Sequence, residues 1–385
     1  MEQTHQHGGN IYRYGKVQDF SANINFRGMP ERVREAALAA VDASVHYPEP
    51  DCGRVRRALA KREQVPAETI LCGNGAAELL FALAQALRPR VAVLAQPCFF
   101  EYEQALAAVG CRLLHRMLRP ERGFVLEESF AEQIPKEADL VVLGNPNNPT
   151  GKLIETPVLQ RILERCEQIG CLLLVDESFF DFLIPQDCVR TIELAGPAAR
   201  SSRLFVLKSF TKMYAMPGLR FGYGICGDTA LLARMRAFLQ PWNVSVPAQM
   251  AAEAAAKETA YARETAEQIA QLRLDMAERL AELGLPVLES CTNYLLFSGP
   301  EGLDVSCRKQ GYLIRNCGNF RGLDGMGAGK LEADAGPLPD TAAVEQHYYR
   351  VCVRSSGENE ALLRVLAEIL CMNHDAEESA DRDRR

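Results

Sequence analysis

The chain has 385 residues, of which 48% are hydrophobic and 24% charged, and its formal net charge is −7. This is the composition of a globular protein with two or three domains. The negative charge argues against a nucleic-acid binder that depends on bulk positive charge. The longest apolar runs are a handful of residues, whereas a membrane-spanning helix needs about 20. Neither nucleic acid nor a membrane is therefore expected as a partner.

The N-terminal stretch and the cysteines indicate the cellular compartment. Residues 1–10 are polar and have neither the basic region nor the apolar region of a secretory signal. The 13 cysteines include no C-x-x-C pair, so we expect buried thiols rather than disulfides or a thiolate zinc site. His5 and His7 are spaced to share a metal ion, but no third ligand accompanies them. We therefore expect a cytoplasmic protein with no metal site.

Short apolar runs alternate with helical patterns through the middle of the chain, as is typical of βαβ units around a mostly parallel sheet. In chain order, helices are predicted at 30–43 and 76–87, and buried strands at 91–95, 140–144, 172–176 and 203–207. A long helical stretch, 248–283, leads to further strands around 287, 294–297, 312–315 and 349–353. The predicted fold class is α/β: a large domain with a mostly parallel central sheet flanked by helices, plus a smaller α+β domain.

These elements suggest where the domains begin and end. We expect an N-terminal arm and part of the small domain at 1–43, a large domain at 44–265 and a small C-terminal domain at 266–373. Residues 321–345 contain five Gly and two Pro and are predicted to be a loop insertion. Residues 374–385 contain five acids and three Arg and are predicted to be a disordered tail.

The segment Ser209-Phe210-Thr211-Lys212 follows one of the predicted strands, and Arg220 lies shortly after it. A lysine in such a place is often only a surface charge. A lysine that is desolvated near other cations, however, has a lowered pKa and becomes a Schiff-base nucleophile. The hydroxyls of Ser209 and Thr211, together with Arg220, would suit the phosphate of a phosphorylated aldehyde cofactor.

Three more loops carry polar groups at expected strand or helix ends. Asp176 ends an apolar run, where a carboxylate is costly unless paired; it is a candidate partner for a protonated pyridine nitrogen, a helix cap or a salt bridge. Residues 144–151 form an Asn- and Pro-rich turn, in which an Asn amide could donate to a cofactor oxygen. Residues 73–78 place small side chains at a helix N-terminus, where backbone N–H groups can approach a phosphate. Because ligands collect at the carboxyl ends of parallel strands, we expect these loops to share one site.

One motif is not assigned a function. Residues 222–227 match the dinucleotide fingerprint G-x-G-x-x-G, but the first Gly sits inside a strand-like run. No acidic residue follows about 20 positions later on a second strand, as that fingerprint requires. We expect no dinucleotide site there.

Taken together and in this order, Asn148 in N-P-T-G, Asp176, Ser209-x-x-Lys212 and Arg220 resemble the motifs of fold-type I pyridoxal phosphate enzymes of the class I/II aminotransferase group. The resemblance covers nearly the whole chain. It implies pyridoxal 5'-phosphate as the cofactor, Lys212 as the residue that binds its aldehyde, and a homodimer.

The resemblance also implies roles for individual side chains. Asp176 would hold the pyridine nitrogen protonated, Asn148 would bind the ring's phenolic oxygen, and Phe99 would stack on the ring. The phosphate would be bound by the amides of Ala76 and Ala77 and the side chains of Ser209, Thr211 and Arg220. Tyr47 would reach this phosphate across the dimer interface, and Arg350 would bind the substrate carboxylate.

Two subfamilies fit: histidinol-phosphate aminotransferases and the threonine-phosphate decarboxylases of cobalamin biosynthesis. The openings His7-Gly8-Gly9-Asn10 and Asp19–Asn25 are similar to segments of the decarboxylases. Phe179 also stands where aminotransferases usually have a Tyr that contacts the cofactor. This resemblance implies decarboxylation of O-phospho-L-threonine to an aminopropanol phosphate for adenosylcobalamin. The implied substrate ligands are His7, Gly8, Asn23, Asn148, Arg315 and Arg350.

Overall fold

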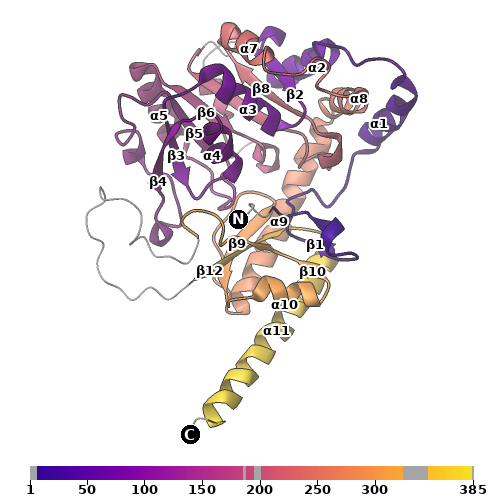
Figure 1. Ribbon diagram of the computed structural model, residues 1–385. Helices are drawn as coiled ribbons and strands as arrows, with labels where there is room; N and C mark the ends of the chain where they lie inside the picture. The colour runs from indigo at the N-terminus through magenta and orange to yellow at the C-terminus, as the bar shows by residue number, and fades with distance from the viewer. Residues whose placement is uncertain (1–6, 185–187, 195–200, 324–345, 384–385) are drawn as a thin grey trace.

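A computed structural model describes residues 7–184, 188–194, 201–323 and 346–383, with side chains as far as Met372 (Figure 1). His5 and most of the predicted loop insertion, 324–345, lie outside the described residues. Within the described ranges, no helix is long and apolar enough to cross a membrane.

A seven-stranded sheet forms the centre of the larger part of the molecule (Figure 1). All its strands run in one direction except β8, which is antiparallel to both of its neighbours. In spatial order they are β2 (Ile70–Gly73), β8 (Gly222–Cys226), β7 (Leu204–Ser209), β6 (Leu172–Asp176), β5 (Leu140–Gly144), β3 (Val91–Gln96) and β4 (Arg112–Met117). The α/β class and the mostly parallel sheet predicted from the sequence are confirmed.

Helices cover both faces of this sheet. Along β5, Leu140 and Val142 belong to the core on one face, and Val141 and Leu143 to the core on the other. The first core is completed by α3 (Ala76–Leu87), α4 (Phe100–Ala107) and α7 (Thr229–Arg236). The second is completed by α2 (Gly53–Glu63), α5 (Thr156–Ile169), α6 (Thr191–Leu194) and α8 (Val246–Ala255), with α1 (Glu31–Ala43) against α8. Because both faces are buried, the central strands read as unbroken apolar runs.

The C-terminal part has two small sheets. An antiparallel sheet has the order β11 (Arg315–Asn316), β12 (His347–Cys352), β9 (Tyr294–Gly299). A two-stranded parallel sheet pairs β1 (Gln18–Asp19) with β10 (Tyr312–Leu313). The single strand predicted at 312–315 was therefore wrong, because its two halves pair with different partners. The early residues of the chain are in this way attached to its C-terminal part.

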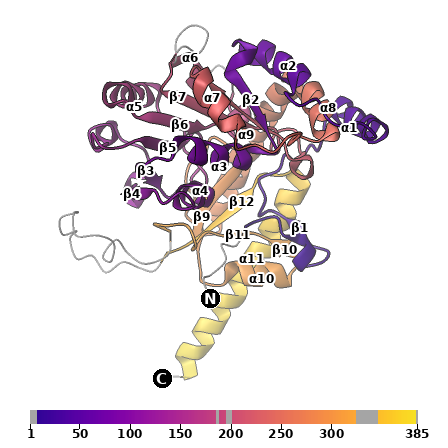
Figure 2. The same cartoon turned by 45° about the horizontal axis from the view of Figure 1, so that its top comes forward.

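A long helix joins the two parts. The stretch predicted at 248–283 is two helices, α8 and α9 (Thr259–Glu282). Helix α9 runs from the large sheet into the C-terminal part (Figure 2). Ile269 of α9 belongs to the core under the large sheet, whereas Met276 and Leu280 belong to the C-terminal core. The predicted boundary at 265/266 falls inside this continuous helix, and the domain boundaries stay predictions.

The C-terminal end differs from expectation. Helix α11 spans Ser356–Asp383, and α10 (Leu303–Lys309) lies beside it. The expectation of a disordered tail at 374–385 was therefore wrong as far as Asp383. Buried Leu362 and Leu366 fix the start of α11, and the Ala- and Glu-rich sequence that follows has high helix propensity. A helix that is already nucleated can continue through such residues at low cost.

Candidate active site

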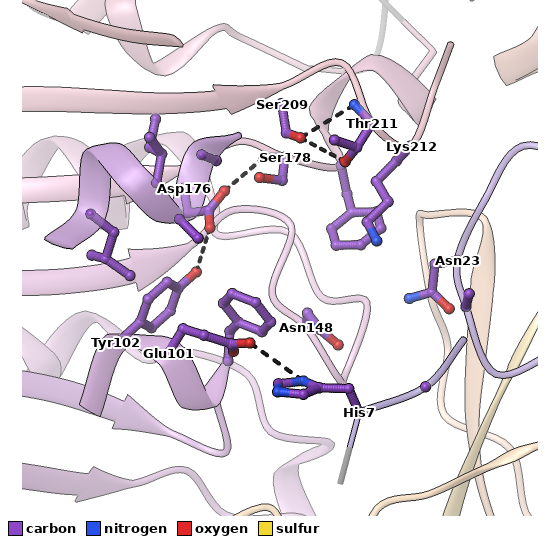
Figure 3. Close-up of a pocket in the computed structure, with 18 of the residues that line it drawn as sticks. His7, Asn23, Glu101, Tyr102, Asn148, Asp176, Ser178, Ser209, Thr211 and Lys212 are labelled. Atoms are coloured by element: carbon purple, nitrogen blue, oxygen red, sulfur yellow. Dashed lines mark hydrogen bonds and ion pairs between the residues drawn. The ribbon is translucent and has the colours of Figure 1, made fainter. Parts of the chain in front are cut away.

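A cavity of about 270 Å³ lies at the carboxyl ends of β6 and β7, where the large sheet faces the C-terminal part (Figure 3). It is lined by every residue predicted for the site except Tyr47: His7, Gly8, Asn23, Ala76, Ala77, Phe99, Asn148, Asp176, Phe179, Ser209, Thr211, Lys212, Arg220, Arg315 and Arg350. The fold thus brings together side chains from both ends of the chain. Their individual roles stay predictions.

Lys212 lies just beyond the end of β7. Burial, together with the nearby charges of Arg350 and Arg220, lowers the pKa of its amine to about 8. The Nζ atom stands 6.0 Å from the centre of the Phe179 ring. A substantial fraction of the amine is therefore neutral at ordinary pH, which is the state that attacks an aldehyde.

Asp176, the last residue of β6, is buried and has no ion-pair partner among the described residues. The Tyr102 hydroxyl donates a 2.8 Å hydrogen bond to its Oδ2, and the Ser178 backbone N–H donates a 2.9 Å bond to its Oδ1 (Figure 3). Burial raises the pKa of Asp176, against these two hydrogen bonds and Lys212. A protonated pyridine nitrogen would supply the missing positive charge.

A cradle for a phosphate lies at the N-terminus of α3. A Cβ atom on Gly75 would lie 2.5 Å from Nη2 of Arg220, and one on Gly222 would lie 2.4 Å from the backbone nitrogen of Ala76. Because both positions are glycines, the Arg220 guanidinium can approach Gly75, and the N-terminus of α3 can approach Gly222 of strand β8. The hydroxyls of Ser209 and Thr211 are 2.7 Å apart in the same cavity. This set of a cation, hydroxyls and helix amides fits a phosphate.

The same packing explains the G-x-G-x-x-G segment. Gly222 and Gly224 lie inside strand β8. A Cβ on Gly224 would meet the Phe205 ring at 2.3 Å, and one on Gly222 would meet α3. These glycines therefore serve close packing within the fold.

The other end of the cavity is strongly cationic. Arg315 and Arg350 face each other on β11 and β12, and each is 6% exposed. Arg350 donates to the side-chain oxygen of Asn148 and, over 3.0 Å, to the backbone oxygen of Ser21, while its buried Nε has no partner. Neither arginine has a carboxylate within ion-pair distance among the described residues. Buried charges without counter-ions are costly, so this end of the cavity is built to receive an anion.

An N-terminal arm, which we define as residues 7–10, closes one side of the cavity. A Cβ on Gly8 would lie 2.4 Å from the backbone oxygen of Ser21, and the Gly9 N–H donates a 2.8 Å hydrogen bond to the Ser21 hydroxyl. Nearby, the buried side-chain oxygen of Asn23 has no hydrogen-bond partner. The arm therefore lies directly against the turn that accepts a hydrogen bond from Arg350.

Sequence reasoning missed Glu101 and Tyr102. Both are in α4 and line the cavity, and Glu101 lies 3.4 Å from Nδ1 of His7 (Figure 3). Their position just after Phe99, beyond the end of β3, was the available signal. An acid in the first turn of a helix is so common that this signal is weak by itself.

Tyr47 lies away from the cavity. It is 78% exposed, and its ring stacks on Trp242 with centroids 4.4 Å apart. The prediction that it completes the site of a second copy is untested by a single chain. No group of three or more metal-ligating side chains occurs in the part of the chain that the structure describes.

Comparison with known proteins agrees with this geometry. Residues 16–366 match the model of the family "Aminotransferase class I and II". A threonine-phosphate decarboxylase of Salmonella typhimurium is 37% identical over 377 residues, which cover 94% of this chain and 96% of the relative. The structure of L-threonine-O-3-phosphate decarboxylase from Porphyromonas gingivalis superposes with a TM-score of 0.76 and 25% identity, covering 91% of this chain and 98% of that one. The histidinol-phosphate aminotransferase of Clostridium acetobutylicum gives a TM-score of 0.78, also at 25% identity, with 91% and 98% covered. The chain belongs to the class I and II aminotransferase family of pyridoxal phosphate-dependent enzymes.

Proposed function

We propose that the protein decarboxylates O-phospho-L-threonine to (R)-1-amino-2-propanol O-2-phosphate, a step in adenosylcobalamin biosynthesis. The observation that carries this proposal is the pair of buried cations, Arg315 and Arg350, which lack carboxylate partners among the described residues. A substrate with a phosphate and a carboxylate brings two anionic groups to these two guanidinium groups. The similarity to a threonine-phosphate decarboxylase over almost the whole chain supports the same substrate.

The residues of the cavity divide into a cofactor end and a substrate end. We assign Lys212 to covalent attachment of pyridoxal phosphate, Asp176 to its ring nitrogen, and Ser209, Thr211, Arg220 and the start of α3 to its phosphate. The cofactor, when bound, takes up the electron pair of the bond that breaks at the substrate's Cα. The protein therefore has to orient the substrate, exclude water and deliver a proton.

Orientation decides which bond breaks. Arg350 is fixed by Asn148 and Ser21, so it can hold one anionic group in a constant place, and Arg315 can hold the other. A decarboxylase must hold the Cα–carboxylate bond perpendicular to the cofactor ring. The Lys212 amine, with its pKa of about 8, can release or take up a proton at Cα near neutral pH.

The alternative is an aminotransferase that recognises phosphate, such as one acting on histidinol phosphate. The fold is equally compatible with it, as the Clostridium acetobutylicum enzyme illustrates. Phe179 favours the decarboxylase, because its buried ring packs edge-on against Tyr294 at 5.0 Å and offers no hydroxyl group to the cofactor.

A product assay distinguishes the two. Cofactor-loaded protein is incubated with O-phospho-L-threonine without any 2-oxo acid, and CO₂ and the phosphorylated amine are followed by mass spectrometry. Repeated turnover to aminopropanol phosphate is expected. Absence of CO₂, together with amino transfer from histidinol phosphate to 2-oxoglutarate, would instead identify an aminotransferase.

We further propose a homodimer in which Tyr47 reaches the partner's cofactor phosphate. Support comes from apolar side chains exposed on and after α1, since Leu38, Val41 and Val45 are 54%, 64% and 81% exposed. Such a patch is typical of an interface. Light scattering should give twice the chain mass; an active monomer would exclude the arrangement.

All 13 cysteines are free, which supports a reducing, cytoplasmic location.

A further inference from the structure

Glu101 and Asp176 are the two acidic residues that line the cavity, and only Asp176 has been assigned a role so far. Its side chain is 15% exposed, and its Oε1 lies 3.4 Å from Nδ1 of His7. Its other carboxylate oxygen, Oε2, is buried without a hydrogen-bond partner. A carboxylate here would repel a phosphorylated substrate unless a proton compensated its charge.

The contact between Glu101 and His7 crosses the molecule. Glu101 stands in the first turn of α4, on the large sheet, whereas His7 belongs to the N-terminal arm. Figure 3 shows the imidazole of His7 in contact with the carboxylate of Glu101, and Lys212 on the other side of the cavity. The arm is also attached to the turn at Ser21, and Glu101 gives it a contact with the opposite wall of the cavity.

We propose that Glu101 is a positioning and specificity-determining residue that holds the His7 ring by Nδ1 and so directs it to the phosphate ester of the substrate. The inference rests on the proposed function, since it names the residue that makes the same site selective for a phosphate. Glu101 acts through His7 and does not bind the reacting atoms.

The charges around the pair are consistent with this role. Burial, with a contribution from the charge of Asp176, raises the pKa of Glu101 to about 7. The charges of Lys212 and Arg315 act in the opposite direction. Burial and then Arg315 lower the pKa of His7. When the pair carries one proton, the carboxyl of Glu101 therefore holds it more readily than the imidazole of His7 does. A neutral acid beside a neutral imidazole, and a carboxylate beside an imidazolium, both carry a net charge of zero.

The proton held by Glu101 and His7 makes the pair selective for a phosphate. When a phosphate dianion enters, the proton moves from Glu101 to His7, and the imidazolium can then donate to the phosphate while Nδ1 remains bound to the carboxylate. No further acid or base is consumed. The pair presents a donor to the phosphate without adding net charge to the site.

The test is a double-mutant cycle on the holoenzyme with Glu101→Ala, His7→Ala and the double variant. We expect Glu101→Ala to raise KM for O-phospho-L-threonine about tenfold, with kcat nearly unchanged. The double variant should be no worse than the more impaired single variant. Glu101→Gln keeps a hydrogen-bond acceptor for Nδ1 and should restore part of the loss. Effects that multiply in the double variant, or a loss confined to kcat, would overturn the proposal.

The same helix offers a matched control. Glu103 lies 3.7 Å from Nδ1 of His115, and neither residue lines the cavity. Glu103→Gln and His115→Ala should leave KM unchanged. Binding of inorganic phosphate to the holoenzyme is measured in parallel and should weaken about tenfold in Glu101→Ala. If the wild type fails to turn over O-phospho-L-threonine, the proposed function is wrong, and the phosphate measurement still decides the role of Glu101.

Discussion

Arg350 donates a hydrogen bond to the side-chain oxygen of Asn148, and this contact joins strand β12 to the loop after β5. The guanidinium also stands over the ring of Tyr294, with its carbon 5.4 Å from the ring centre. The charge that is available to bind substrate is therefore held rigidly, and it is the same charge that lowers the pKa of Lys212.

Arg350→Met should raise the pKa of Lys212 above about 8, because it removes the largest electrostatic contribution to the lowered value. The neutral amine attacks the aldehyde, so the rate of covalent cofactor capture rises with pH through the lysine pKa. In the variant the half-maximal rate should move to higher pH, and kcat/KM should fall about 100-fold. Borohydride trapping over pH 6–10 measures the shift. Arg350→Lys keeps the charge and should leave the midpoint in place; an unchanged midpoint in Arg350→Met would contradict the assignment.

Asp176→Asn should have opposite effects on stability and activity. Burial raises the pKa of Asp176, so its stabilising contribution is complete below the unfolded-state pKa of about 4 and is lost as pH rises through the folded pKa. In the cofactor-free protein at neutral pH, the neutral amide should therefore raise Tm by a few degrees, about 2 °C or more. Activity of the loaded enzyme should fall at least about 100-fold, because the ring nitrogen loses its anionic partner. Calorimetry and the product assay test the two halves separately, and a lower Tm in the cofactor-free variant would refute the first.

Gly8→Ala should loosen the N-terminal arm. The added Cβ would lie 2.4 Å from the Ser21 backbone oxygen, which also accepts from Arg350. We expect KM for the phosphorylated substrate to rise about tenfold, with little change in Tm because the core is untouched. Gly357→Ala serves as control, since a Cβ there meets nothing within 4 Å. Equal kinetics in Gly8→Ala and wild type would mean that the arm does not contribute to binding.

Phe179→Tyr should alter the spectrum of the bound cofactor more than the turnover. The ring lies beneath the Lys212 amine, and a hydroxyl there can donate to the cofactor's phenolic oxygen. We expect the pH midpoint of the cofactor's visible absorbance to fall by about one unit. A small amount of amino transfer should also appear beside decarboxylation. A titration curve superimposable on that of the wild type would show that the hydroxyl does not reach the cofactor.

The central strands and Lys212 were predictable because their signals are local. The run Leu172–Val175 is apolar because it is buried on both sides, and Ser209 to Lys212 carry their chemistry within four residues. Most site residues came from the resemblance to a family, since nothing local marks Arg315 or Asn23 as functional.

Features that depend on tertiary contacts were not predictable in this way. Tyr312 to Arg315 read as one strand, but the two halves pair with β1 and β12, which lie far away in sequence. Glu101 looks like an ordinary acid in the first turn of a helix, and only the fold places it against His7, 94 positions earlier. The tail at 374–385 was judged by its charge, although its Ala and Glu content also favours continuing a helix.

The parallel pairing of β1 with β10 has a consequence for biosynthesis. Gln18 and Asp19 find their partners only at residues 312–313, and the backbone of Phe20 accepts a hydrogen bond from Cys352. While the chain is still emerging from the ribosome, the large sheet can assemble, but His7 and Asn23 have no surface to settle on. Residues synthesised early are thus among the last to reach their final places, and the cavity is completed only after residues 312–352 have been made.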